Sequence, residues 1–297
     1  MPADQRAVIV KLLREASVEV SGHDVTVAGK LSPWLRPGAD VYVNFVPGHS
    51  YRQSAEVAAV VRRAGFTPIP HVAARSMRDR AELSDFLKRL SGEAAVERVL
   101  VIGGDVLKPV GSYASSLDVI RTGLLQENGI RSVAVAGHPE GHPFIQQFAL
   151  CEALKEKVEL TRATGLDLSI VTQFCFEAAP ILDWLKMARA SGIDVPVRIG
   201  IAGPAGIATL LKFAVRCGIG NSLRALSNRP QAFGRLLTDN APDELVRALA
   251  ERLPQSPGLL PGLHFFPFGG VAKTGRWLAG ALKAEASYIS LASSAQR

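Results

Sequence analysis

The sequence predicts a (β/α)8 barrel that uses residues 1–297 as a single domain. The first observation is a set of eight short runs rich in β-branched residues, each bounded by turn residues. Between most of these runs, apolar residues recur at three-to-four spacing, which is typical of strands that alternate with helices. Several runs, such as 99–102, are almost continuously apolar, as expected for parallel strands covered on both faces.

The expected strands are spaced widely enough for a crossover helix between neighbours. They are 17–21, 40–46, 67–72, 98–103, 131–136, 168–174, 197–201 and 263–267. The expected helices are 54–64, 79–90, 115–127, 144–161, 178–190 and 205–215, and the long interval 202–262 holds more than one helix, including 243–253. The alternative is an open doubly wound sheet, but Ser21-Gly22-His23 after the first strand lacks the glycine fingerprint of that class.

Composition excludes several classes of protein. A hydrophobic fraction of 47% and a charged fraction of 21% supply a sizeable core and exclude a disordered chain. The 27 glycines and 18 prolines follow no period, which excludes a fibrous protein. The net charge of +7 is not concentrated in one tract and aromatics are only 6%, so we expect no nucleic-acid partner.

Cysteine usage and the N-terminal segment indicate a cytoplasmic protein. Cys151, Cys175 and Cys217 are widely separated and fit no metal or redox spacing, as expected of reduced thiols. Charges interrupt the N-terminal segment, and no uncharged apolar run reaches about 18 residues, so we expect neither a signal peptide nor a membrane span. The oligomeric state stays open, a homo-oligomer included.

Polar residues gather at the carboxyl ends of the expected strands, where barrel active sites are assembled. Glu19 alternates with Val18 and Val20, so it points into the barrel mouth if these valines face the helices. Partial desolvation would there raise its pKa and suit a general acid, and a buried structural ion pair is the alternative. The other polar residues at strand ends are Asn44, His71, Gly103-Gly104-Asp105, His138, Glu140, His142, Gln173 and His264. The spacing of His138, Glu140 and His142 matches no helical ligand pair, so no metal is expected.

Seven short motifs occur in an order and spacing that are specific together. They are Ser17-Val18-Glu19-Val20, Ile69-Pro70-His71-Val72, Val101-Ile102-Gly103-Gly104-Asp105, Tyr113-Ala114-Ser115, Gly137-His138-Pro139-Glu140-Gly141-His142-Pro143, Leu154-Lys155-Glu156-Lys157 and Thr172-Gln173-Phe174-Cys175-Phe176. Over most of residues 17–201 the chain therefore resembles the methylenetetrahydrofolate reductase family in its short form limited to the barrel. The length leaves no room for the C-terminal regulatory domain of longer relatives, so control by such a domain is not expected.

The resemblance implies an oxidoreductase of folate one-carbon metabolism and methionine biosynthesis. A hydride would pass from NADH or NADPH through FAD to the methylene carbon of 5,10-methylenetetrahydrofolate, giving 5-methyltetrahydrofolate, or in the reverse direction. The implied catalytic residues are Glu19, which protonates folate N10, Asp105, beside flavin and pterin, and Gln173, which contacts folate and nicotinamide in turn. These three and Phe174 are the implied substrate contacts. The implied cofactor-binding residues are Asn44, His71, Gly104, Asp105, Tyr113, Ala114, His138, His142 and Lys157.

Departures from the family pattern leave alternatives open. The usual Arg-Gly-Asp is Gly103-Gly104-Asp105, the family's tyrosine is His138, and its aspartate, asparagine and arginine flavin contacts fall on Leu150, Ala153 and Glu156. One alternative is direct, flavin-independent hydride transfer, and another is a non-redox protein that binds folate or assists methyl transfer. A third is a lyase-type barrel that uses His71 and Glu19 as an acid–base pair. The loop at Ser222-Leu223-Arg224 is expected to contact folate or pyrophosphate.

Overall fold

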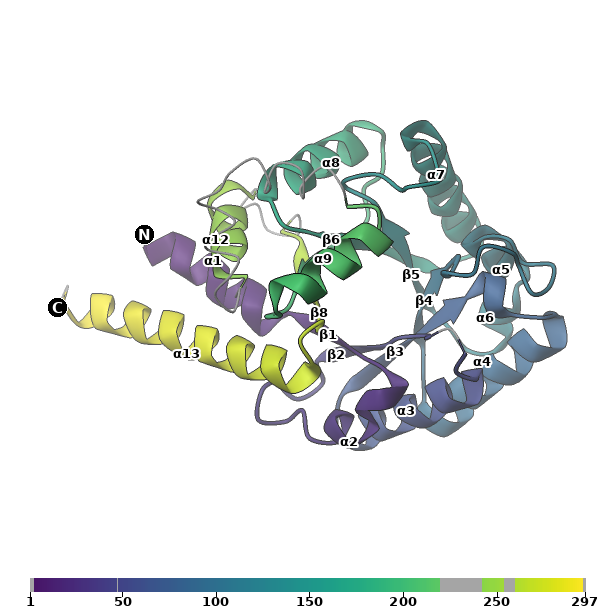
Figure 1. Cartoon of the computed structure of the whole chain (residues 1–297), viewed down its shortest axis with the longest axis horizontal. Helices are drawn as coiled ribbons and strands as arrows, with labels where there is room; N and C mark the ends of the chain where they lie inside the picture. The colour runs from purple at the N-terminus through teal and green to yellow at the C-terminus, as the bar shows by residue number, and fades with distance from the viewer. Residues whose placement is uncertain (1–2, 47, 220–241, 254–259, 296–297) are drawn as a thin grey trace.

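Eight parallel strands close into a barrel in chain order, and β8 pairs with β1 (Figure 1). The computed structural model describes residues 3–46, 48–219, 242–253 and 260–295. The strands are β1 (Ser17–Val20), β2 (Asp40–Val43), β3 (Thr67–Ala73), β4 (Arg98–Ile102), β5 (Ser132–Gly137), β6 (Asp167–Cys175), β7 (Val197–Ala202) and β8 (Gly262–Phe266). Each of the eight expected strands is present, so the predicted (β/α)8 class is confirmed.

Helices surround the barrel, and most of them occupy the predicted intervals. They are α1 (Ala3–Arg14), α2 (Val25–Ala28), α3 (Tyr51–Arg63), α4 (Arg80–Ala94), α5 (Ser116–Arg121), α6 (Leu124–Glu127), α7 (Gln147–Ala163), α8 (Ala178–Ala190), α9 (Ile207–Arg216), α12 (Asp243–Arg252) and α13 (Val271–Ala295). The predicted helix 115–127 is divided into α5 and α6 because Gly123 between them has a φ of +73°, a left-handed conformation that glycine adopts readily. In the described ranges, no helix is long and apolar enough to cross a membrane.

Local hydrogen bonds explain why α3 and α4 begin where they do. Ser50 and Gln53 form a reciprocal capping box at the start of α3. The Asp79 side chain accepts a hydrogen bond from the Glu82 backbone N–H at 2.8 Å and caps α4. Both caps satisfy N–H groups that have no partner inside the helix, and they fix the point at which each crossover turns back along the sheet.

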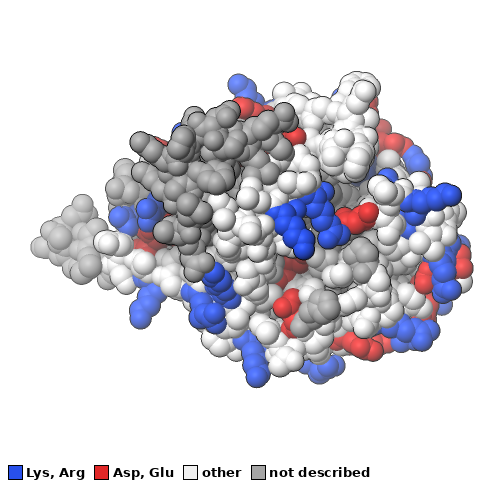
Figure 2. Space-filling view, in the orientation of Figure 1, with Lys and Arg blue, Asp and Glu red and all other residues white. Residues whose placement is uncertain are grey.

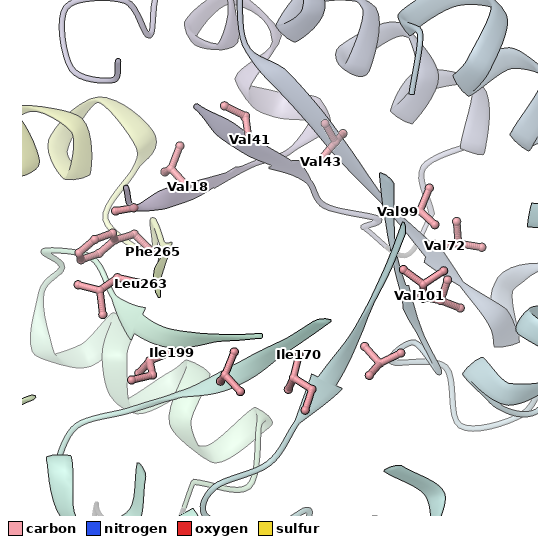
Figure 3. Packing of buried hydrophobic residues seen from close by; sticks show 14 of the residues in the cluster. Val18, Val41, Val43, Val72, Val99, Val101, Ile170, Ile199, Leu263 and Phe265 are labelled. Carbon is pink, nitrogen blue, oxygen red and sulfur yellow. The ribbon is translucent and has the colours of Figure 1, made fainter. Parts of the chain in front are cut away.

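Two apolar layers alternate along the strands. Val18, Val41, Val99 and Ile170 belong to the large core between the sheet and the helices, and Figure 3 shows such side chains pointing away from the barrel interior. The intervening residues form a smaller interior cluster of Tyr42, Ile69, Leu100, Ala134 and Val171. Because successive side chains of a strand point to opposite faces, a residue next to Val18 or Val20 must face the interior. This register places Glu19 inside the barrel.

Candidate active site

A cavity of about 460 Å³ opens at the carboxyl ends of the strands. Its lining residues come from β1, β3, β4, β5, β6 and β8, from the segments that follow several strands, and from α9, which crosses in front of the barrel opening (Figure 1). The implied site residues among them are Glu19, Asn44, His71, Gly104, Asp105, His138 and Gln173. The barrel therefore brings together polar side chains that are up to 154 residues apart in the sequence.

Glu19 lies at the centre of a buried polar cluster. Its side chain is almost inaccessible, with a residue exposure of 6%. The Asn44 amide donates a hydrogen bond to Glu19 Oε1 at 2.5 Å. The other carboxylate oxygen, Oε2, faces two imidazoles, with His71 Nε2 at 3.6 Å and His264 Nε2 at 3.5 Å. One carboxylate is thus surrounded by groups from β3, from β8 and from the residue that follows β2, and these groups can donate to it or exchange a proton with it.

These neighbours favour the ionised form of the Glu19 carboxyl. Burial raises its pKa, but the hydrogen-bonding and charge interactions with His264 and His71, together with the Asn44 amide, outweigh burial and bring the pKa below its ordinary value. Burial also lowers the pKa of both histidines, and their attraction to Glu19 only partly opposes this. The expectation of a raised Glu19 pKa was therefore wrong, because it considered burial without the imidazoles that come from distant strands.

A serine on the same strand as Glu19 supports one of the two imidazoles. Ser17 Oγ lies 3.0 Å from His264 Nδ1 and 3.2 Å from the Leu263 carbonyl oxygen. The Ser17 hydroxyl carries one proton, so it donates either to the Leu263 carbonyl oxygen or to His264 Nδ1, according to the tautomer of the imidazole. The arrangement holds the imidazole edge toward the carboxylate.

Asp105 and Gln173 lie at the rim of the cavity. Asp105 follows β4 and Gly104, whose φ of +91° turns the chain there. Gln173 lies where β6 bulges: Val171 pairs with Arg198 and Phe174 pairs with Gly200, so three steps along β6 match two along β7. Its Oε1 accepts a hydrogen bond from the Phe174 N–H at 3.2 Å. The bulge places Gln173 on the cavity side, opposite Asp105.

Several residues implied as ligand contacts do not line this cavity. Phe174 is fully buried in an aromatic cluster with Phe176, Phe266 and Phe268. Tyr113 belongs to the core between sheet and helices, and the Ala114 carbonyl accepts a hydrogen bond from Arg75 Nε at 2.8 Å. The predicted contacts at Ser222, Leu223 and Arg224 lie outside the described residues.

Two histidines and a lysine lie at the β5 side of the cavity: His138, His142 and Lys157. The rings of His138 and His142 are 5.3 Å apart, edge to face. Burial, with smaller contributions from His142 and Lys157, lowers the pKa of His138 to about 4. Burial is the one resolved cause that lowers the pKa of Lys157, and no carboxylate within the part of the chain that the structure describes contributes to it. A desolvated lysine without a counter-ion is suited to an anionic group such as a phosphate.

The adjoining face of α7 carries fewer polar groups. Glu156 forms an ion pair with Arg121 of α5. Leu150 and Leu154 pack with Trp184 behind His138, around a space of only about 20 Å³. This face therefore lacks free donors and acceptors at the positions where the family resemblance places contacts to the cofactor.

Two functional candidates were missed by the sequence reasoning. His264 was noted as a polar residue at a strand end but was not assigned to the site, although its position opposite Ser17 and Glu19 follows from barrel closure between β8 and β1. Arg216 on α9 was not considered, and its contact with Asp105 has no local sequence signal because 111 residues separate the two. Cys217 also lines the cavity, but burial raises the pKa of its thiol to about 11, so it is not poised as a nucleophile.

Metal ligation has no support in the residues with described positions, where no group of three or more His, Cys, Asp or Glu side chains could hold an ion. The described part of the chain is thus a (β/α)8 barrel whose strand ends carry a buried carboxylate–imidazole cluster below an acidic and amide rim. These features define a (β/α)8 barrel protein with a polar cavity at the carboxyl ends of its strands, the end at which barrel active sites are assembled.

The chain belongs to the methylenetetrahydrofolate reductase family, whose model matches residues 38–224. This range includes Asn44, His71, Asp105 and Gln173. Glu19 and His264 lie outside it, and the barrel geometry joins them to the same cavity.

Two curated relatives carry the family's name. Methylenetetrahydrofolate reductase 2 of Saccharomyces cerevisiae (strain ATCC 204508 / S288c) is 32% identical over 126 residues, which cover 41% of this chain and 19% of that protein. The 5,10-methylenetetrahydrofolate reductase of Pectobacterium carotovorum subsp. carotovorum is 27% identical over 176 residues, covering 58% of this chain and 55% of that protein. The chain thus matches about a fifth of one relative's length and about half of the other's.

Solved structures support the fold. An uncharacterized Clostridium thermocellum protein that binds two copies of 5-methyl-5,6,7,8-tetrahydrofolic acid has a TM-score of 0.55 and 13% identity, covering 96% of this chain and 99% of that one. A mutant tryptophan synthase alpha-subunit from Pyrococcus furiosus has a TM-score of 0.50 and 12% identity, covering 93% and 96%. At this level of identity both likenesses concern the barrel fold alone.

Proposed function

We propose that this chain is an oxidoreductase that reduces 5,10-methylenetetrahydrofolate to 5-methyltetrahydrofolate with NADH or NADPH, or runs the reverse oxidation. The observation that carries the proposal is the buried Glu19 carboxylate, hydrogen-bonded to Asn44 and faced by His71 and His264 at the base of a cavity rimmed by Asp105 and Gln173. Membership of the family supports the same activity.

In this proposal Glu19 supplies the proton that opens the folate's five-membered ring at N10. Because the interactions around Glu19 lower its pKa, the carboxyl must gain a proton in the complex. A folate bound over the cavity excludes water and strengthens the burial that raises the carboxyl's pKa, and His71 and His264 lie close enough to pass the proton on. The carboxylate of Asp105 would accept hydrogen bonds from pterin N–H groups, while the amide of Gln173 would orient the reacting ring.

The residues present fit the ring and phosphate parts of FAD. His71, Gly104, Asp105 and His138 line the cavity, and the desolvated Lys157 next to His138 is suited to a phosphate. When bound, the flavin would carry the hydride between nicotinamide and folate. The chain's own part is to hold the two partners in turn against one face of the cavity and to keep water out.

Direct hydride transfer from the nicotinamide to folate is the second candidate. The observation that favours it is the α7 face, where Glu156 is paired with Arg121 and Leu150 packs against an apolar wall. The cavity, the Glu19 cluster and the rim residues would serve this reaction in the same way, because the acid step at N10 does not depend on the hydride donor.

An absorbance spectrum of the purified protein, followed by titration with NADH and NADPH, tests the cofactor. A flavin spectrum with folate-dependent oxidation of the nicotinamide supports the FAD route. A colourless protein that catalyses the same oxidation and gains nothing from added FAD supports direct transfer. A protein that binds methyltetrahydrofolate but oxidises neither nicotinamide would contradict the proposed redox function and indicate a folate-binding accessory protein.

Replacement of the acid tests the mechanism. We expect Glu19→Gln to lower folate reduction by about two to four orders of magnitude, the usual contribution of a positioned acid. Nicotinamide binding should change little. Glu93→Gln, at an exposed glutamate of α4, is the matched control and should retain full turnover. Turnover of Glu19→Gln within a few-fold of the unmodified protein would contradict the role of Glu19.

A further inference from the structure

An arginine of α9 reaches across the cavity mouth to the rim aspartate. Arg216 Nη2 lies 2.8 Å from Asp105 Oδ2, which joins the last turn of α9 to the segment after β4. Figure 2 shows basic side chains gathered over α9 beside an acidic group. Among the described residues that line the cavity, Arg216 is the only lysine or arginine.

The ion pair between Arg216 and Asp105 is easily exchanged. Its two side chains are 55% and 62% exposed, and a pair in water contributes little to stability because both groups are well solvated when apart. A ligand that offers N–H donors to Asp105 can therefore displace Arg216 at small cost. The displaced guanidinium remains at the mouth, free to bind an anion.

The remaining charges of the cavity restrict where an anionic ligand can place its charge. The lining carboxylates are Glu19, Asp24 and Asp105, and each would repel a ligand carboxylate. The α9 side of the cavity differs, because it carries two cations. Arg216 lies in the last turn of α9, and Lys212 lies one turn before it on the same face of the helix. Lys212 is exposed. An anionic tail that leaves the cavity along α9 meets two cations in succession.

We infer that Arg216 is the residue that recognises the glutamyl carboxylates of the folate tail, and that it does so by leaving Asp105 when the pterin arrives. The inference rests on the proposed folate substrate. It goes further by naming Arg216 as the side chain that distinguishes a folate with a glutamyl tail from a pterin without one. Binding of the ring and of the tail are coupled, because the same event frees Arg216 and occupies Asp105. Lys212 extends the site to longer tails.

Equilibrium binding of three ligands to the whole chain tests the inference. The ligands are 5-methyltetrahydrofolate with one glutamate, its triglutamate, and 6-methyltetrahydropterin, which has the ring and no tail. We expect Arg216→Gln to weaken both tailed ligands by about 10- to 100-fold, the value of a charge-assisted hydrogen bond. Binding of the tail-free pterin should be unchanged or tighter, because Asp105 no longer has an internal partner.

Further variants separate recognition from general electrostatics. Arg216→Lys should recover part of the lost affinity for tailed ligands. Lys212→Gln should reduce the advantage of the triglutamate while it leaves monoglutamate affinity within about two-fold. Arg63→Gln, at an exposed arginine of α3, removes the same formal charge away from the mouth and should leave all three affinities unchanged.

Two results would overturn the inference. One is an equal loss of affinity for tailed and tail-free ligands in Arg216→Gln, which would make Arg216 a general support of the cavity. The other is unchanged affinity for all three ligands. Failure of the unmodified protein to bind any of them is a different result, since it would refute the proposed folate substrate and the tail site together.

Discussion

His138 is a partly buried imidazole whose neutral form is favoured in the folded protein. Burial brings its pKa to about 4, whereas an unfolded histidine titrates near 6.5. Between these two values the unfolded chain binds more protons than the folded protein, so the free energy of unfolding falls as the pH falls. Protonation of His138 in the unfolded chain should lower the free energy of unfolding by about 2 kcal/mol between pH 7 and pH 5.

Urea unfolding at pH 7 and pH 5 measures this contribution. The unmodified protein should lose stability on acidification, and His138→Gln should lose about 2 kcal/mol less. His142→Gln is the comparison variant, because burial also lowers the pKa of His142, but by less than that of His138, so it should recover a smaller part of the loss. Equal pH dependence in the unmodified protein and His138→Gln would show that His138 is not buried in the neutral form.

Glu19 illustrates how far single residues can be predicted from the sequence. The alternation with Val18 and Val20 predicted that Glu19 lies on the opposite face of the strand from these valines, but only the fold shows that this face is the barrel interior. The sign of its pKa shift was not predictable, because His71 and His264 come from strands 52 and 245 residues away and only barrel closure brings them to the carboxylate. Local patterns give orientation, whereas electrostatics depends on the assembled fold.

At the scale of elements, the bulge in β6 requires a glycine in β7. A Cβ placed on Gly200 would lie 2.3 Å from the Thr172 carbonyl oxygen and 2.7 Å from the Phe266 ring. The Gly200 N–H also donates to Thr172 Oγ1 at 2.9 Å. We expect Gly200→Ala to lower the free energy of unfolding by about 2–3 kcal/mol, because the backbone of β6 must move. The same movement should displace Gln173 and weaken ligand binding.

The control is a glycine with space around it. Gly92 lies within α4, and a Cβ there meets nothing within 4 Å. Gly92→Ala should raise the free energy of unfolding by about 0.5–1 kcal/mol, since alanine favours the helix. Thermal and urea unfolding of both variants provide the comparison. Similar stabilities for the two variants would contradict the close approach of β6 and β7.

Elements differed in how well the sequence predicted them. The eight strands were predictable because buried parallel strands are apolar on both faces and end at turn residues. The bulge in β6 was not, because Thr172-Gln173-Phe174 carries no local irregularity and the extra residue is visible only against β7. α1 and α13 were not predicted as helices. In the structure an ion pair of 2.7 Å between Arg6 and Glu285 joins them, a contact between the two ends of the chain that no local pattern indicates.

On the scale of the whole molecule, one carboxylate ties three strands together at the opposite end of the barrel from the cavity. Asp40 is the first residue of β2, and its side chain forms ion pairs with Arg98 of β4 and with Arg198 of β7, the latter at 2.6 Å. Asp40 is buried, while the arginines are 39% and 25% exposed, so water reduces the strength of the network.

Neutralising this carboxylate should destabilise the barrel without disturbing the cavity. Asp40→Asn leaves two arginines facing each other without their anion, and we expect a loss of about 1–3 kcal/mol in the free energy of unfolding. Glu127→Gln removes one partner of the exposed Arg80–Glu127 pair and should cost less than about 0.5 kcal/mol. Affinity for 5-methyltetrahydrofolate should be unchanged in both variants, because Asp40 lies at the amino ends of the strands and Glu19 faces their carboxyl ends. Loss of ligand affinity in folded Asp40→Asn protein would show instead that the two ends of the barrel are coupled.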